Sequence, residues 1–252
     1  SSIMSKKLAA GAHNIVLDVK IGSGAFMKTE EQGIKLAEKM VNIGKSFNRN
    51  IAAVITNMDR PLGCAIGNSL EVLEAVSVLK GNEVPDFDRV CVALASTLLS
   101  LCYGISHEES EKRVLESIRN GAALAKFREW ITAQGGNDEF VDNPEALGTA
   151  KYITEYKAQG SGYISFMNTE MIGKAAAALG AGREKTTDSV DHTAGIVLRK
   201  KTGDAVRSGD VIAVLYTNKE ASEIEAARLL SEAITYSAEK PAEESLVYGI
   251  IK

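Results

Sequence analysis

Hydrophobic and polar positions divide the first part of the chain into strand-like and helix-like segments. Residues 14–21 (NIVLDVKI) and 51–58 (IAAVITNM) are almost continuously apolar, which is typical of parallel strands covered on both faces. Between them, Thr29 and Gln32 have the spacing of a capping box, which predicts a helix that runs to about Phe47. This alternation predicts an α/β fold with a mostly parallel sheet flanked by helices.

A short helix is predicted before the first strand. Met4, Leu8 and Ala12 form its apolar stripe, and Ser2 and Lys6, four residues apart, share another face. A solvated amphipathic helix is one interpretation of this spacing. The other is a ligand site, because a hydroxyl and an ammonium near the first turn of a helix favour a ligand edge rich in acceptor oxygens.

Three further helices are predicted before residue 131. The second is strongly apolar and is expected to be buried between layers, whereas the third is amphipathic. Capping-box spacings mark the starts of the first and third helices. The three helices, with their caps, are expected over residues 68–80 (Asn68 and Glu71), 86–103, and 106–130 (Ser106 and Glu109).

The pattern changes between residues 148 and 159, where short alternating strands replace the long helices. We therefore expect a central α/β domain over residues 1–150 and a smaller α+β unit, partly barrel-sandwich-like, over residues 151–252. Its expected elements are strands at 153–158 and 162–168, a helix at 169–179, two strands within 195–217, a helix at 219–238 and a closing strand at 245–251.

Composition and charge mainly argue against certain classes of partner. The formal net charge of −4, with no basic stripe interleaved with aromatic residues, argues against a nucleic-acid partner. Cys64, Cys91 and Cys102 lack CxxC spacing and are expected to be buried thiols in a reducing cytosol. No signal peptide or bilayer-spanning apolar run is evident, so a cytoplasmic protein with no membrane partner is expected.

Three motifs resemble those of a known family. SSIMSKKLA at residues 1–9, DVKIGSGAFMK at 18–28 and MDRPLGCAIGNSLEVLEA at 58–75 are similar, in order and spacing, to the pyrimidine-nucleoside phosphorylases, close kin of the thymidine phosphorylases. The resemblance implies reversible phosphorolysis of uridine, thymidine or deoxyuridine to the free base and a pentose 1-phosphate. It further implies inorganic phosphate as co-substrate, no organic cofactor, and a homodimer for the complete protein.

The resemblance also implies which residues contact the nucleoside. Lys6 would be the catalytic residue, because its charge stabilises the departing base, and Ser2 would orient the edge of that base. Ile3 and Phe26 would line the same pocket as apolar walls. These four residues are the expected substrate-binding set.

A potassium site is implied by the third motif. The backbone carbonyls of Leu62 and Ala65 and the carboxylate of Glu74 match the potassium ligands of the family. Carbonyl cages of this kind suit a weakly hydrated monovalent cation. Glu71 is a competing carboxylate, and a simple helix-capping turn is the alternative interpretation of this segment.

Compared with the family, this sequence is expected to lack an N-terminal lobe that carries the phosphate-binding residues and the remaining potassium ligands. His13, His107 and His192 do not lie in a motif that can be matched. We therefore expect the segment to hold the base-binding half of the site and to be inactive alone.

Three other functions remain open. A strict thymidine phosphorylase differs in sugar preference, and the sequence does not separate ribose from deoxyribose. An enzyme like anthranilate phosphoribosyltransferase would need magnesium and a pyrophosphorylated ribose. A biotinyl or lipoyl carrier is suggested by the K-x-G-D-x-V-x-x-G-D-x-I pattern at 201–212, but no lysine hairpin occurs at the place such carriers need.

Overall fold

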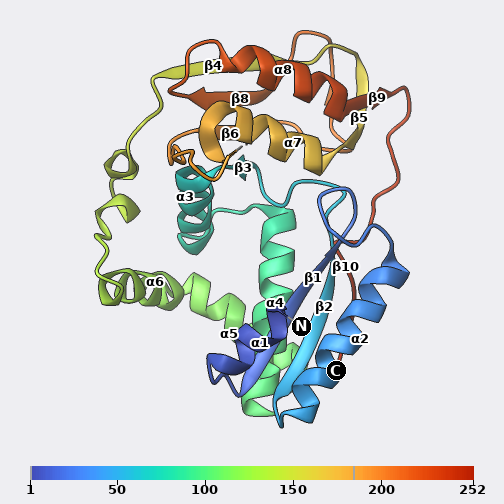
Figure 1. The fold of residues 1–252 in the computed structure, drawn as a ribbon, viewed down its shortest axis with the longest axis vertical. Coiled ribbons are helices and arrows are strands. Elements are labelled where there is room, and N and C mark those ends of the chain that lie inside the picture. Colours follow the sequence, from blue (N-terminus) through green and yellow to red (C-terminus); the bar gives the residue numbers. More distant parts are fainter. Residues whose placement is uncertain (1, 184) are drawn as a thin grey trace. The chain divides into compact units, whose positions relative to one another are not determined.

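The computed structural model describes residues 2–183 and 185–252 (Figure 1). The chain forms two compact units, each assembled from separated segments. Unit 1 comprises Ser1–Met58, Pro85–Asn120 and Ser245–Lys252, and unit 2 comprises Asp59–Val84 and Gly121–Glu244. Helices accompany sheets in both units, so the expected mixed α/β class is confirmed.

Unit 1 is organised around a three-stranded sheet in the order β1-β2-β10. Its strands are β1 (Asn14–Ile21), β2 (Asn50–Asn57) and β10 (Val247–Ile251). β1 and β2 are parallel, and β10 pairs with β2 in the antiparallel direction. The two apolar runs of the sequence therefore form the parallel pair, as predicted.

Two helices share the core on one face of this sheet: α1 (Ser2–Ala9) and α2 (Glu30–Ser46). α2 approaches the strands closely because glycines replace side chains that would clash. A Cβ at Gly33 would lie 2.3 Å from Ile21 Cγ2, and a Cβ at Gly44 would lie 2.7 Å from Ile51 Cδ1. Met4 anchors α1 in the same core, with 2% of its surface exposed.

α4 (Pro85–Tyr103) contacts β1, β2 and α5 (His107–Arg119). Its buried residues are Val90, Ser96 and Thr97, and Leu98 is 39% exposed. The sequence predicted that this helix is buried between layers. That prediction overestimated its burial, because only part of the surface of α4 is covered. Within the described chain, no single helix is long and apolar enough to cross a membrane; α4 and α5 meet that test only together, as a pair bent by 118°.

The helix predicted over residues 106–130 is wrong as a single element. Its start is confirmed, because Ser106 Oγ accepts a hydrogen bond from Glu109 N. The helix α5 ends at Arg119, and α6 (Ala122–Ala133) begins after Gly121. Gly121 has φ of 78°, a left-handed conformation that interrupts an α-helix and favours glycine.

Unit 2 contains two antiparallel sheets, β3-β6-β8-β4 and β7-β5-β9. Alanine, isoleucine and leucine side chains from both sheets, α7 and α8 form its main core. The strands are β3 (Ala65–Ile66), β4 (Tyr152–Lys157), β5 (Gly162–Met167), β6 (Gly195–Leu198), β7 (Ala205–Val206), β8 (Val211–Thr217) and β9 (Ile234–Ser237). The helices are α3 (Asn68–Leu79), α6, α7 (Thr169–Ala176) with a π turn at Ala177–Ala181, α8 (Ser222–Ala233), and 3₁₀ turns at Glu139–Val141 and Pro144–Leu147.

Some details of unit 2 differ from the sequence predictions. α8 ends at Ala233, and the next four residues form β9 beside β5 instead of continuing the helix to residue 238. This segment contains Thr235 and Tyr236, which favour a strand once a partner strand is available. α3 is capped at Gly67, not Asn68: the Glu71 carboxylate accepts a hydrogen bond from Gly67 N.

The compact units interleave along the chain. Residues 59–84 join the C-terminal part, and Ser245–Lys252 returns to the first sheet. The assignment of these two segments to the other unit depends on contacts between residues far apart in the sequence, which the composition along the chain does not reveal. The division into domains at 1–150 and 151–252 stays a prediction.

Candidate active site

The turn after β1 presents one aromatic side chain to solvent. Gly22 N donates to Met27 O at 3.0 Å, which closes the turn on itself. Gly24 N donates to Met58 O at 3.1 Å, which ties the turn to the end of β2. Phe26, at the tip, is 97% exposed, so the turn holds an apolar ring available for a ligand.

Side chains of the following helix start fix the same turn. Lys28 Nζ donates to Ser23 O at 2.9 Å. Thr29 Oγ1 accepts from Gln32 N at 3.3 Å, and Gln32 Oε1 accepts from Lys28 N at 3.0 Å. The capping box predicted from Thr29 and Gln32 is confirmed, with its reciprocal bond made to the residue before the cap.

The other three predicted nucleoside contacts lie on α1. Ser2, Ile3 and Lys6 are exposed, with 54% of the Ile3 surface accessible, while Met4 anchors the helix from its opposite side. In the described part of the chain, no hydrogen bond or ring contact joins these residues to Phe26. The structure thus places the four residues on two segments of unit 1 and leaves their surfaces open.

A polar cluster near the ends of β1 and β2 was not identified as a site from the sequence. Lys20 Nζ lies 2.7 Å from Asp18 Oδ2 and 3.3 Å from Thr56 Oγ1, and the Thr56 hydroxyl also bonds Asp18. Two effects raise the pKa of the nearby Cys91 thiol: burial, which is the larger, and the negative charge of Asp88. The sequence does contain a signal for this cluster, because the charged residues Asp18 and Lys20 interrupt the otherwise apolar strand at residues 14–21.

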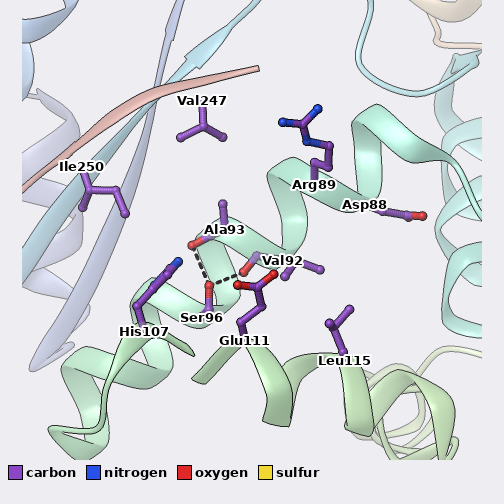
Figure 2. A pocket seen from close by; sticks show the side chains of 10 residues that line it. All are labelled: Asp88, Arg89, Val92, Ala93, Ser96, His107, Glu111, Leu115, Val247 and Ile250. Atoms are coloured by element: carbon purple, nitrogen blue, oxygen red, sulfur yellow. Dashed lines mark hydrogen bonds between the residues drawn. The ribbon is translucent and has the colours of Figure 1, made fainter. Parts of the chain in front are cut away.

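A hollow of about 410 Å³ lies between α4, α5 and β10 (Figure 2). Its lining is mainly apolar, and the predicted site residues do not contribute to it. Ser96 Oγ faces the hollow but donates back to Val92 O at 2.6 Å. The charged and polar side chains that line it are Asp88, Arg89, Ser96, His107 and Glu111.

The predicted cation loop lies in unit 2. The Glu74 carboxylate accepts hydrogen bonds from Cys64 N at 2.8 Å and from Ala65 N at 3.2 Å. Gly63 has φ of 72°, and a Cβ there would lie 2.2 Å from Glu74 Oε2. The carboxylate is therefore fitted against the backbone of the loop at a position that only glycine allows.

The pairing of β3 decides which carbonyl oxygens remain available. β3 is an edge strand, and Leu198 N donates to Cys64 O at 2.8 Å. Ala65 N donates to Glu74 and not to β6, and the N–H and C=O groups of one strand residue point to the same side, so we infer that the Ala65 carbonyl is also directed away from β6. The competing Glu71 is occupied with Gly67 N at 3.0 Å.

These donors fit a monovalent cation better than a transition metal. The described residues contain no group of three or more His, Cys, Asp or Glu side chains that could hold a metal ion. Carbonyl oxygens with a single carboxylate are the hard, weakly charged donors that potassium accepts. Leu62, Ala65 and Glu74 are thus compatible with the ligand roles implied by the sequence.

Comparisons with known proteins cover most of the chain. A model described as "Glycosyl transferase family, a/b domain" matches residues 1–124, and one described as "Pyrimidine nucleoside phosphorylase C-terminal domain" matches residues 163–237. The pyrimidine-nucleoside phosphorylase of Geobacillus stearothermophilus is 44% identical over 252 residues, which is 100% of this chain and 58% of that protein. The chain belongs to the pyrimidine-nucleoside phosphorylase family.

Other members of the family give similar values. The pyrimidine-nucleoside phosphorylase of Staphylococcus epidermidis strain ATCC 12228 is 47% identical over 226 residues, 89% of this chain and 52% of that protein. The one from Staphylococcus aureus strain USA300 is 47% identical over 221 residues, 87% of this chain and 51% of its own. The chain spans about half the length of the curated relatives it matches. The family resemblance predicted from three motifs is confirmed.

Proposed function

We propose that this chain forms the base-binding half of a pyrimidine-nucleoside phosphorylase. The enzyme would cleave uridine, thymidine or deoxyuridine reversibly with inorganic phosphate, and release the free base and a pentose 1-phosphate. The observation that carries the proposal is the 44% identity with the Geobacillus stearothermophilus pyrimidine-nucleoside phosphorylase over all 252 residues. The exposed nucleoside-contact residues of unit 1 are consistent with it.

The chemistry assigns a role to each polar group of α1. Phosphate attacks C1′ as the bond to the base breaks, and the electron pair of that bond leaves with the base. The sugar gains oxocarbenium character and the base gains negative charge, so a donor aimed at the base stabilises the transition state more than the substrate. Lys6 supplies this charge, and Ser2 fixes the orientation of the base by hydrogen bonding.

Two apolar side chains complete the base contacts. Phe26 and Ile3 are 97% and 54% exposed, so both side chains are accessible to a ligand. A pyrimidine packed against them would remove this area from water. The hydrogen-bonded turn fixes the backbone on either side of Phe26.

Potassium and phosphate are the proposed small-ion partners. Leu62 and Ala65 would offer carbonyl oxygens and Glu74 a carboxylate oxygen to the potassium ion, which would supply a fixed positive charge when bound. The phosphate contacts and the remaining potassium ligands are assigned to the half of the family sequence that this chain does not span. No organic cofactor is part of the proposal.

Binding of the base tests the proposed half-site directly. We expect the 252-residue chain alone to show no turnover of uridine or thymidine but to bind uracil, as measured by saturation-transfer NMR. Lys6→Met should weaken uracil binding, whereas Lys7→Met, an exposed neighbour on the same helix, should leave it unchanged. Equal effects of the two variants would remove Lys6 from the base contact.

A substrate panel separates the alternative transferases. A polypeptide that combines this chain with the remaining half should release base from uridine and from thymidine in the presence of phosphate. Turnover of thymidine alone would indicate a strict thymidine phosphorylase. Magnesium-dependent transfer from a pyrophosphorylated ribose to anthranilate would replace the proposal by a phosphoribosyltransferase. We further propose a cytoplasmic homodimer for the complete protein.

A further inference from the structure

A lysine from a distant turn contacts the backbone of the cation loop. Lys201 Nζ donates to Pro61 O at 2.8 Å and to Gly63 O at 2.6 Å, across 140 and 138 residues of sequence. Lys201 is partly buried, and both contacts lie within unit 2. One ammonium therefore holds the carbonyls on either side of Leu62.

The turn that carries this lysine is itself fixed. Lys201 N donates to Asp204 Oδ2 at 2.8 Å, and Asp204 N donates back to Lys201 O at 3.0 Å. Gly203 N donates to Ile164 O at 2.8 Å, which ties the turn to β5. The lysine side chain thus extends from a rigid base, so its reach to the loop is set by the fold.

Three partners divide the backbone groups of residues 61–65 among them. Pro61 O and Gly63 O are occupied by Lys201, and Cys64 O is occupied by Leu198 N. Cys64 N and Ala65 N are occupied by the Glu74 carboxylate. Of the five carbonyl oxygens of residues 61–65, these contacts occupy three and leave those of Leu62 and Ala65, the two assigned to potassium.

We propose that Lys201 is a positioning residue for the cation loop. By holding Pro61 O and Gly63 O, its ammonium turns the intervening carbonyl of Leu62 toward the side where a cation can reach it. Its charge also offsets that of Glu74, so the loop attracts a monovalent cation but gives little advantage to a divalent one. The identity of the cation rests on the proposed function, whereas the positioning of the loop does not.

Amide hydrogen exchange in the 252-residue chain tests the positioning. Lys201→Met should accelerate exchange of the Cys64 and Ala65 amides by at least about tenfold, because a lost charge-assisted hydrogen bond contributes at least that factor. Lys201→Arg should restore most of the protection. Lys200→Met is the matched control and should change both rates less than about twofold, since among the described residues Lys200 bonds through its backbone N–H, to Ile212 O, and not through its side chain.

A measurement on the unaltered chain keeps the proposal testable if Lys201→Met does not fold. NMR couplings across hydrogen bonds should connect Lys201 Nζ to the carbonyl carbons of Pro61 and Gly63. Absence of these couplings, or equal exchange in the Lys201→Met and Lys200→Met variants, would overturn the positioning role.

Titration with salts separates the lysine from the cation. At constant ionic strength, KCl should shift the Leu62 and Ala65 carbonyl resonances of the unaltered chain, while choline chloride should not. In the Lys201→Met variant the ratio of calcium affinity to potassium affinity should rise at least about tenfold, because removal of the ammonium charge favours a divalent cation more than a monovalent one. Unchanged potassium and calcium responses in this variant would overturn the charge argument. No potassium response in the unaltered chain, with accelerated exchange in Lys201→Met, would overturn the potassium assignment and support the positioning role.

Discussion

Replacing Gly63 by alanine should destabilise unit 2 through the Glu74 carboxylate. Two terms contribute to the loss. The left-handed conformation of Gly63, with φ of 72°, costs a residue with a Cβ about 1 kcal/mol. The new Cβ would also lie 2.2 Å from Glu74 Oε2 and displace a carboxylate that accepts hydrogen bonds from Cys64 N and Ala65 N.

The displaced hydrogen bonds determine the size of the effect. Hydrogen bonds to a charged group contribute roughly 1.5–3 kcal/mol, so Gly63→Ala should lower the free energy of unfolding by about 2.5–4 kcal/mol in total. Gly135→Ala is the matched control, because Gly135 has φ of 78° in the same unit and no atom within 4 Å of the added Cβ. It should lose only the conformational term of about 1 kcal/mol.

Urea unfolding followed by fluorescence measures this difference. Trp130 is the single tryptophan of the chain and lies on α6 in unit 2, so its emission reports on the relevant unit. In a Glu74→Ala background, Gly63→Ala should cost no more than the control, because the carboxylate it displaces is gone. Equal losses for Gly63→Ala and Gly135→Ala in the unaltered background would refute the carboxylate argument.

Three other predictions follow from exposure and titration. Phe26→Ala should change the free energy of unfolding by less than about 0.5 kcal/mol, because the ring is 97% exposed, and should weaken binding of uracil; a large loss of stability would contradict the surface role. Burial raises the pKa of Tyr156 to about 12 from an ordinary 10, so the stability due to this neutral phenol is full below pH 10 and is lost as pH rises toward 12; Tyr156→Phe should flatten that part of the stability curve. Iodoacetamide should modify the exposed Cys102 well before Cys91, whose thiol pKa is raised by burial, as followed by mass spectrometry of peptides; faster labelling of Cys91 would contradict its burial.

Local signals in the sequence predicted most element starts correctly. The β1 boundaries, the Thr29 cap and the Ser106 cap agree with the structure because each depends on residues within one turn or one strand. The start of α3 differed: Gly67 is the cap, and the Asn68 side chain donates through Nδ2 to the distant Ala181 carbonyl. Similarly, residues 234–237 became a strand because β5 offers a partner.

For the candidate site too, some features could be predicted from the sequence and others needed the structure. The exposure of Phe26 follows from the glycine turn that the sequence shows, and the Glu74 carboxylate was selected over Glu71 by motif resemblance alone. The structure adds a physical distinction, since Glu71 caps α3 through Gly67 while Glu74 contacts the loop. Lys201 could not be found from the sequence, because no local pattern relates it to a carbonyl 138 residues away.

The return of Ser245–Lys252 to the first sheet has a consequence for synthesis on the ribosome. Asn57 Nδ2 donates to Ser245 O across 188 residues, and β10 completes a sheet whose other two strands emerge near the start. One edge of β2 therefore stays open while every residue of unit 2 is translated. During that interval a nascent chain presents an apolar strand edge, a template for mispairing with its neighbours on a polysome.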